Sequence, residues 1–390
     1  MSERVVQAPT TPFTLLTPGR IVFGRGAADG AAAAIAAMGL RPLVVRGQSV
    51  AWVDTLIADL TRASIPPLVI TARGEPDLPG LIQHLAAARA QGVDVVVAVG
   101  GGSVIDLGKA LAALLPAPQP PLTYLEVVGK GEPLTASPLP FIAIPTTAGT
   151  GAEATKNAVI AVPEHGRKVS LRDDRMLPDL ALIDAGLTDG APREVTLASG
   201  LDAITQVIEP YLSARANTLT DALCVDAIPR GLAALVRLMA CEDPGARDAL
   251  AYVSHVSGIA LANAGLGAVH GFAGVIGGRT GAAHGAVCGR LLVPVLQANR
   301  AALLAAGRDV RRFDDVAGWI GQALGVPTSA AVACLGAQVS AWGLPGLGAL
   351  GVDAQEAGQI AQEARVSSSM KGNPVALPHL ALMDILAAAA

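Results

Sequence analysis

The chain has 390 residues, of which 52% are hydrophobic and 15% are charged, and its formal net charge is −4. This composition predicts a packed globular protein, because disordered chains carry few hydrophobic residues, and the length favours two domains. The small negative net charge argues against nucleic-acid binding, and no apolar run reaches the roughly 20 residues that span a membrane.

Two further features bear on the cellular compartment. The first residues, Met-Ser-Glu-Arg, lack the apolar core of a signal peptide. The four cysteines are far apart and form no Cys-x-x-Cys pair, which suits a reducing compartment and argues against a thiolate zinc site. These are Cys224, Cys241, Cys288 and Cys334. We therefore expect a cytoplasmic protein.

Short apolar strands alternate with helices in the first half of the chain. Residues 13–23 are typical of a hairpin with a turn at Pro18-Gly19. Further strands are predicted at residues 42–45, 67–70, 95–99, 141–144, 159–160 and 180–183, and helices at 27–38, 53–63, 78–90 and 104–114. This alternation predicts an α/β domain over residues 1–192 with a doubly wound parallel sheet, whose ligands bind at the carboxyl ends of the strands.

A glycine-rich turn, Gly100-Gly101-Gly102-Ser103, joins the buried strand 95–99 to the helix 104–114. The first N–H groups of a helix are unpaired and carry the positive end of its dipole, so this geometry binds phosphate groups. Glycine lets a ligand approach the backbone, and Ser103 is expected to cap the helix. The spacing matches neither Gly-x-Gly-x-x-Gly nor a P-loop, and the alternative is a plain tight turn. We predict a phosphate site.

A second polar loop, residues 145–153, follows the strand 141–144. It offers the hydroxyls of Thr146, Thr147 and Thr150, together with two glycines. These hydroxyls either bind a polar ligand or cap the loop's own backbone. Because both loops follow strands of one parallel sheet, we expect them to share a ligand.

The second half changes character after Gly190-Ala191-Pro192. Its pattern predicts an all-α domain over residues 193–390. Helices are expected at residues 195–213, 218–240, 246–264, 286–306, 313–324, 330–342, 354–366 and 380–389.

Within this half, three side chains suit a metal. Asp202 and Gln206 are four residues apart and share one helix face, whereas His270 and His284 fall on different elements of a glycine-rich stretch. One carboxylate and two imidazoles fit Zn²⁺ or Fe²⁺ with an open coordination position. Spacing alone leaves open that the histidines only pack in the core.

Five motifs together resemble the iron-containing (group III) alcohol dehydrogenase family. They are Gly-Gly-Gly-Ser-Val-Ile-Asp-Leu-Gly-Lys at 100–109, Pro-Thr-Thr-Ala-Gly-Thr-Gly-Ala-Glu at 145–153, Gly-Leu-Asp-Ala-Ile at 200–204, Gly-Leu-Gly-Ala-Val-His at 265–270 and Ser-Met-Lys-Gly-Asn-Pro at 369–374. They occur in the family's order and cover nearly the whole chain. The resemblance implies a dinucleotide-binding α/β domain, a helical domain, and a site in the cleft between them.

The resemblance also implies an activity and partners. The family transfers hydride between NAD(P)H and an alcohol, aldehyde or ketone, usually with Fe²⁺ or Zn²⁺. We accordingly expect an NAD(P)-dependent enzyme with a small-molecule alcohol or carbonyl substrate, a homodimer, and no nucleic-acid or membrane partner.

Residue roles are carried over by motif. Gly101, Gly102 and Ser103 match the pyrophosphate turn, with Asp106 close by on the same helix. Four residues match family positions that line the nicotinamide side of the cofactor: Thr146, Thr147, Thr150 and Asn157. Lys168 matches the family's lysine that contacts the nicotinamide ribose. The catalytic metal ligands are matched by Asp202, His270 and His284.

Two positions depart from the family's pattern. Gln206 stands where the family has a fourth ligand histidine, and Gly274 stands where it has a second histidine near the nicotinamide. A glutamine oxygen is a weaker ligand than imidazole for either metal. The chain can still supply a three-ligand site of the kind seen in related glycerol dehydrogenases. The alternatives are a metal-independent reductase resembling maleylacetate reductases, a dehydroquinate synthase-like lyase, or a nucleotide-binding protein with a decayed site. The ligand set and the 369–374 motif favour the dehydrogenase branch.

The cofactor preference is predicted from Arg46-Gly47-Gln48-Ser49, which follows the strand 42–45. NAD-preferring relatives often have an aspartate where Gly47 stands, which binds the ribose hydroxyls. Gly47 leaves room for a 2′-phosphate and offers its N–H, and Arg46 and Ser49 can bond the phosphate oxygens. The alternative is a turn whose arginine points to water. We predict NADP(H) in preference to NAD(H).

Overall fold

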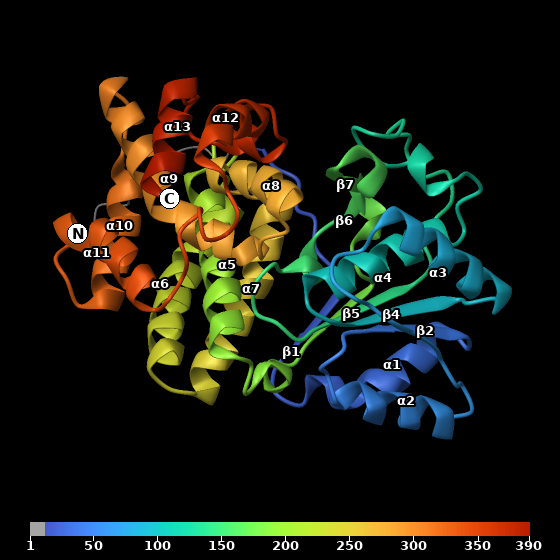
Figure 1. Ribbon diagram of the computed structural model, residues 1–390. Coiled ribbons are helices and arrows are strands. Elements are labelled where there is room, and N and C mark those ends of the chain that lie inside the picture. The colour runs from blue at the N-terminus through green and yellow to red at the C-terminus, as the bar shows by residue number, and fades with distance from the viewer. Residues whose placement is uncertain (1–11) are drawn as a thin grey trace.

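The computed structural model of the chain describes residues 12–390. Figure 1 shows a sheet region and a helical region side by side. The sheet has six strands in the order β1-β8-β5-β4-β2-β3, and all neighbouring strands are parallel. The strands are β1 (Arg20–Phe23), β2 (Pro42–Arg46), β3 (Leu68–Thr71), β4 (Val95–Gly100), β5 (Phe141–Pro145) and β8 (Leu180–Ile183). The predicted parallel α/β sheet is confirmed.

Helices cover both faces of this sheet. Helices α1 (Ala31–Met38) and α2 (Trp52–Arg62) lie on one face, and α3 (Leu78–Ala90) and α4 (Gly102–Leu114) lie on the other (Figure 1). Strand β4 is buried along its whole length. Its alternate side chains pack into the two different cores, which explains the continuous apolar run in the sequence. The doubly wound arrangement is confirmed.

One prediction for this region is wrong, and one predicted strand is present but lies in a different sheet. Residues 12–18 form no strand, and β1 pairs in parallel with β8, so the hairpin at 13–23 does not exist. The sequence cannot show that β1 pairs with the distant strand β8 instead of with the neighbouring residues 13–17. Residues 159–160 belong to β6 (Asn157–Val162), which pairs antiparallel with β7 (Arg167–Arg172) in a separate two-stranded sheet instead of joining the main one.

The chain after Ile183 contributes helices and no further strand to the described structure. These are α5 (Arg193–Leu212), α6 (Thr218–Ala240), α7 (Pro244–Ala264), α8 (Ala268–Thr280), α9 (His284–Ala305), α10 (Arg311–Leu324), α11 (Thr328–Ala341), α12 (Ala357–Arg365) and α13 (His379–Ala388). The predicted helical half is confirmed, and we propose the domain boundary between residues 192 and 193. Helix α8 was not predicted, because its glycines disfavour a helix and only burial against α9 and α12 compensates.

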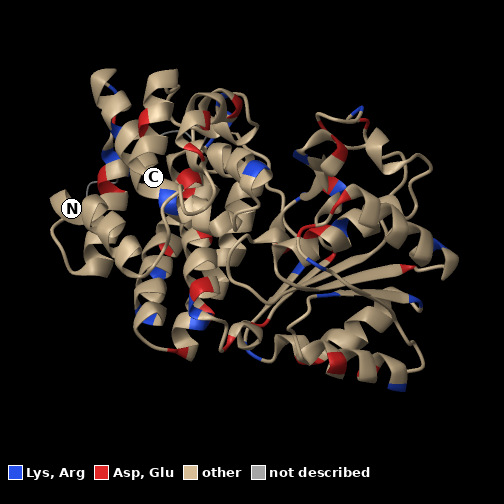
Figure 2. Ribbon diagram, viewed as in Figure 1, with Lys and Arg blue, Asp and Glu red and all other residues tan. Residues whose placement is uncertain are grey.

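Charged side chains are mixed in sign over both regions (Figure 2). Many of them form surface ion pairs, such as Arg230 with Asp226 and Arg300 with Asp314. Within the described residues, no single helix has the length and apolar character to cross a membrane, and the bent pairs α7–α8 and α10–α11 reach that threshold only when each pair is taken together.

Candidate active site

The glycine turn lies where β4 meets α4. The backbone of Gly101 is extended and forms the N-cap of α4, and no side chain caps the helix. Ser103 therefore lies in the first turn of α4, and the prediction that it caps the helix is wrong. The strand, turn and helix N-terminus otherwise have the arrangement that binds phosphate.

The two polar loops are in contact. A Cβ atom on Gly102 would lie 2.7 Å from Thr150 Oγ1, and one on Gly101 would lie 3.2 Å from Thr147 Oγ1. The Thr146 N–H donates to the Gly100 carbonyl over 3.0 Å. Glycine at both positions of the turn is what lets the threonine loop approach so closely, so the two predicted ligand loops form one surface.

Contacts of Asp106 and Asn157 hold the two-stranded β6–β7 sheet against α4. The Asp106 carboxylate accepts the Val159 N–H over 3.0 Å. The fully buried Lys109 ammonium donates to Thr155 Oγ1 over 2.7 Å and to the Asn157 carbonyl over 2.6 Å. Burial lowers the pKa of Lys109, and the neighbouring Asp106 opposes that shift. These contacts anchor β6, and with it the β7 strand that carries Lys168.

Lys168 extends from β7 toward α8. Its ammonium pairs with Glu75 and lies 3.5 Å from the position of a Cβ on Gly277. Gly274 is one helical turn before Gly277 on the same face of α8, and a Cβ there would have no atom within 4 Å. The position of the missing histidine therefore opens into space beside the helix face that Lys168 reaches.

The loop predicted to read the cofactor ribose differs from expectation in two contacts. The Gly47 N–H is not available, since it donates to the Val99 carbonyl over 3.0 Å. The Arg46 guanidinium donates to the Val50 carbonyl over 3.0 Å and pairs with Asp54. Strand pairing thus occupies the Gly47 N–H, and the loop carbonyl and Asp54 occupy the Arg46 guanidinium. Ser49, in contrast, is exposed.

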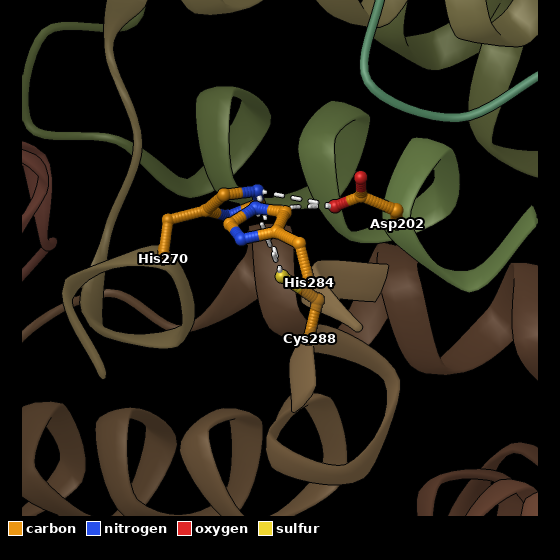
Figure 3. Close-up of side chains that lie close together, drawn as sticks. All are labelled: Asp202, His270, His284 and Cys288. Carbon is orange, nitrogen blue, oxygen red and sulfur yellow. Dashed lines mark hydrogen bonds and ion pairs between the residues drawn. The ribbon is translucent and has the colours of Figure 1, made fainter. Parts of the chain in front are cut away.

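Four potential metal donors converge from three helices (Figure 3). Asp202 comes from α5, His270 from α8, and His284 and Cys288 from α9, and one donor atom of each lies within 4.8 Å of all the others. His270 Nε2 is 3.4 Å from Asp202 Oδ1 and 3.7 Å from Cys288 Sγ. His284 Nε2 is 3.8 Å and 3.6 Å from the same two atoms. We refer to these four residues as the donor cluster.

Sequence reasoning missed Cys288. The search for cysteine ligands considered only Cys-x-x-Cys pairs, and Cys288 has no such partner. It follows His284 by four residues on a helix, which is the spacing that places two side chains on one face. The signal was present as a His-x-x-x-Cys pair.

The donor cluster fits a divalent cation. Asp202 Oδ1 is buried and has no hydrogen-bond partner among the described residues, although burying an unpaired carboxylate oxygen is costly. It points at the two imidazoles and the sulfur (Figure 3). Asp202, His270 and Cys288 are buried, while the His284 side chain is 39% exposed, so the cluster reaches solvent past His284.

The cluster shifts the pKa values of its own members. The Cys288 sulfur, with help from Asp202, outweighs burial and raises the pKa of His284 to about 9. Burial opposes protonation of His270, but Cys288 and Asp202 together raise its pKa well above the usual value. Burial likewise disfavours the Asp202 carboxylate, but the two histidines lower its pKa. Without a metal, the cluster therefore holds protons where a cation fits.

Gln206 lies one turn beyond Asp202 and is oriented by other groups. Its amide nitrogen donates to the Thr150 carbonyl over 2.7 Å and to Ser257 Oγ over 2.9 Å. The side chain thus joins the threonine loop to α5 and α7.

Comparisons with known proteins identify the family. Residues 18–185 match the iron-containing alcohol dehydrogenases, and residues 196–390 match the C-terminal part of the same family. The chain belongs to the iron-containing alcohol dehydrogenase family. This membership confirms the predicted reaction class, oxidoreduction between an alcohol and its carbonyl compound.

Individual relatives and structures agree with this family. The probable alcohol dehydrogenase EutG of Escherichia coli K12 is 34% identical over 304 residues, which are 76% of this chain and 74% of that protein. The lactaldehyde reductase of E. coli K12 is 35% identical over 224 residues, 57% of this chain and 58% of that protein. A 1,3-propanediol oxidoreductase structure has a TM-score of 0.87 at 29% identity and covers 97% of this chain and 100% of that chain.

Proposed function

We propose that the protein is an NAD(P)H-dependent, metal-assisted oxidoreductase that acts on small alcohols and their aldehydes or ketones. The observation that supports this most strongly is a line of contacts from the glycine turn to the donor cluster. Gly102 contacts Thr150, the Thr150 carbonyl accepts a hydrogen bond from Gln206, and Gln206 lies one turn from Asp202. A cofactor on the turn therefore extends toward the metal donors.

Each group of residues along this line of contacts has a different role. The turn Gly101-Gly102-Ser103 binds the pyrophosphate through backbone N–H groups, and the threonine loop orients the nicotinamide half. Lys168 reaches the ribose, and Asp106 and Asn157 act indirectly by anchoring its strand. Asp202, His270 and His284 hold a divalent metal, Fe²⁺ or Zn²⁺, which when bound polarises the substrate oxygen as a Lewis acid. The cofactor supplies the redox chemistry, and the protein orients it.

NADPH is the proposed preferred cofactor, with NADH as a second. The support is that position 47 carries no carboxylate to repel a 2′-phosphate and that Ser49 is exposed beside it. Arg46 contributes only after exchanging its present contacts with the loop and Asp54.

Small hydroxylated aldehydes are the proposed first substrates to test. Two of the similar proteins are described as a lactaldehyde reductase and a 1,3-propanediol oxidoreductase. Both names describe short oxygen-bearing carbon chains, and this chain shares its family and fold with them.

The test is a matrix of cofactors, metals and substrates. The purified protein is stripped with a chelator, and NADPH and NADH oxidation are followed with a series of short aldehydes, before and after addition of Fe²⁺ or Zn²⁺. We expect turnover that needs the metal and prefers NADPH. A protein that binds neither dinucleotide would overturn the proposal.

A second candidate is a metal-independent reductase of the same fold. The specific observations that favour it are Gln206 and Gly274, which replace two histidines of the family pattern. In that case the stripped protein turns over aldehydes at the full rate, and added metal changes nothing.

A cytoplasmic homodimer stays a prediction from the sequence. All four cysteines are free, as expected in a reducing compartment. The edge strand β1 exposes Ile21 and Phe23, and an open strand edge can pair with another chain. Light scattering coupled to size-exclusion chromatography measures the subunit number directly.

A further inference from the structure

Cys288 has a place in the donor cluster that the sequence did not assign. We propose that the Cys288 thiolate is the fourth protein ligand of the metal, in the role that Gln206 cannot fill. This inference rests on the proposed metal-assisted function: it specifies which residues of this chain hold the ion and leaves the substrate oxygen to add as a fifth ligand.

The spacing of the donor atoms matches one tetrahedral ion. Zinc bonds of about 2.1 Å to nitrogen and oxygen and about 2.3 Å to sulfur place tetrahedral N and O donors about 3.4 Å apart and N and S donors about 3.6 Å apart. The two N···S separations are 3.7 and 3.6 Å. The N···O separations are 3.4 and 3.8 Å. These four separations are therefore close to ligand spacing, and the remaining two pairs of donor atoms lie within 4.8 Å.

The packing of α9 against α5 fixes the sulfur in this position. A Cβ on Gly285 would lie 2.2 Å from the Ala198 carbonyl oxygen, and one on Gly289 would lie 2.5 Å from Leu201 Cδ1. Two glycines four residues apart thus let the helices approach closely, and Cys288 lies between them in the sequence. Asp202 Oδ1, buried without a hydrogen-bond partner, points into the same space.

The Gln206 side chain is held by hydrogen bonds to groups outside the donor cluster. Its amide nitrogen donates to both Thr150 and Ser257, and this ties the side chain to the loop and to α7. A thiolate is also a stronger ligand than an amide oxygen for Zn²⁺. On binding, the sulfur and the two imidazole nitrogens form bonds to the metal, and the protons that these three groups held go to solvent. The ligand set of one carboxylate, two imidazoles and one thiolate favours Zn²⁺ over Fe²⁺.

Cobalt substitution tests this without measuring activity. Chelator-stripped parent protein is titrated with Co²⁺ in the absence of air, because a cobalt–thiolate bond gives a charge-transfer absorption band in the near ultraviolet that N and O ligands do not give. We expect one Co²⁺ per chain with this band. Cys288→Ala and Cys288→Ser lose the band and bind Zn²⁺ about 10- to 100-fold more weakly or worse. Cys224→Ala, a change at a buried cysteine outside the cluster, and Gln206→Ala keep the band.

X-ray absorption of the zinc-loaded parent keeps the test independent of variant folding. One sulfur at about 2.3 Å from zinc is expected. A first shell without sulfur, a band that survives in Cys288→Ala, or a parent that binds no metal would each overturn the inference. If the metal-loaded parent is active but has no sulfur ligand, this inference is overturned and the proposed function stands. If the metal has a sulfur ligand but the protein is inactive, this inference stands and the proposed function is overturned.

Discussion

The Glu209 carboxylate holds His270 from behind the donor cluster. Its Oε2 lies 2.7 Å from His270 Nδ1, and its Oε1 accepts the Val269 N–H over 2.7 Å. Both side chains are buried. An acceptor at Nδ1 keeps one imidazole proton there, so that loss of the second proton leaves the Nε2 lone pair facing Asp202 and Cys288. Glu209 is thus a positioning residue for the proposed metal site.

Replacement of Glu209 by glutamine is expected to weaken Zn²⁺ binding about 10- to 100-fold. If the new amide oxygen keeps the Val269 N–H, the amide nitrogen donates to Nδ1 and drives the imidazole proton to Nε2, where a metal has to bind. The measurement is a competition titration of Zn²⁺ against a chromophoric chelator.

The chain provides a matched control for this change. Glu153 Oε1 lies 3.1 Å from His255 Nδ1 in a second buried carboxylate–histidine pair, outside the donor cluster. Glu153→Gln is expected to alter the unfolding temperature while Zn²⁺ affinity stays at the parent value. Equal loss of zinc in both variants would assign the effect of Glu209→Gln to general destabilisation.

The Gly102→Val variant is expected to weaken NADPH binding about 5- to 150-fold, which corresponds to an overpacking cost of about 1–3 kcal/mol. The structure assigns part of this loss to the threonine loop, because the new Cβ would lie 2.7 Å from Thr150 Oγ1 and 2.9 Å from Thr150 Cγ2. Fluorescence titration with NADPH gives the dissociation constants.

A double variant separates the two causes. Gly102→Ala carries the same Cβ, and adding Thr150→Ala removes the two nearest atoms that it meets and leaves only Thr150 Cβ at 3.3 Å. Recovery of NADPH binding in the double variant shows that the loop collision dominates. Failure to recover shows that the Cβ itself blocks the pyrophosphate, and unchanged binding in Gly102→Val would place the phosphate site elsewhere.

The histidines of the cluster predict a pH dependence of the metal-free protein. An imidazole whose pKa is raised in the folded state stabilises the protein fully below the unfolded pKa of about 6.5, and this stabilisation is lost as the pH rises through the folded value. For His284 the folded pKa is about 9. The unfolding temperature in chelator is therefore expected to fall between pH 6.5 and 9 by more than it does with Zn²⁺ bound.

The same protons oppose the metal. Binding of Zn²⁺ at pH 7 has to displace them, so proton release is expected, and the apparent affinity rises with pH toward 9. Calorimetry in buffers of different ionisation enthalpy counts the protons. His284→Gln is expected to release fewer, and a parent that releases none would contradict the assigned protonation.

The sequence predicted the elements whose signal is local. The β-branched run before Gly100 and the alternation of strands and helices led to the parallel sheet, and the long apolar helices led to the second domain. The partner of β1 and the separate β6–β7 pair were not predictable, because a short strand carries no record of which distant segment pairs with it. Helix α8 was missed because its stability comes from packing and its own propensity is poor.

Prediction of the site was likewise limited to what local sequence signals reveal. Asp202, His270 and His284 were predicted by their residue types and by the resemblance, and the structure brings these three together. The spacing of Cys288 from His284 puts both on one face of α9, but its distance from Asp202 also depends on Gly285 and Gly289, which allow α9 to approach α5, and this relationship between two helices is not visible in the sequence. The Gly47 N–H was assigned to a ligand because its partner, the Val99 carbonyl, belongs to another strand.

Gly47→Asp tests the cofactor preference. A Cβ at this position makes only ordinary contacts, 3.7 Å from Val50 Cγ2 and 3.8 Å from Val104 Cγ2, so a side chain can start here without displacing the turn. With the ribose bound as proposed, its carboxylate repels a 2′-phosphate and accepts hydrogen bonds from ribose hydroxyls. The expected cost to NADPH is about 1–3 kcal/mol in kcat/KM, with NADH unchanged or improved. The measurement is the ratio of kcat/KM for the two cofactors in the parent and the variant. Gln48→Asp, one residue further along the same loop, controls for added charge. A parent that prefers NADH, or an equal change in both variants, would show that position 47 does not select the cofactor.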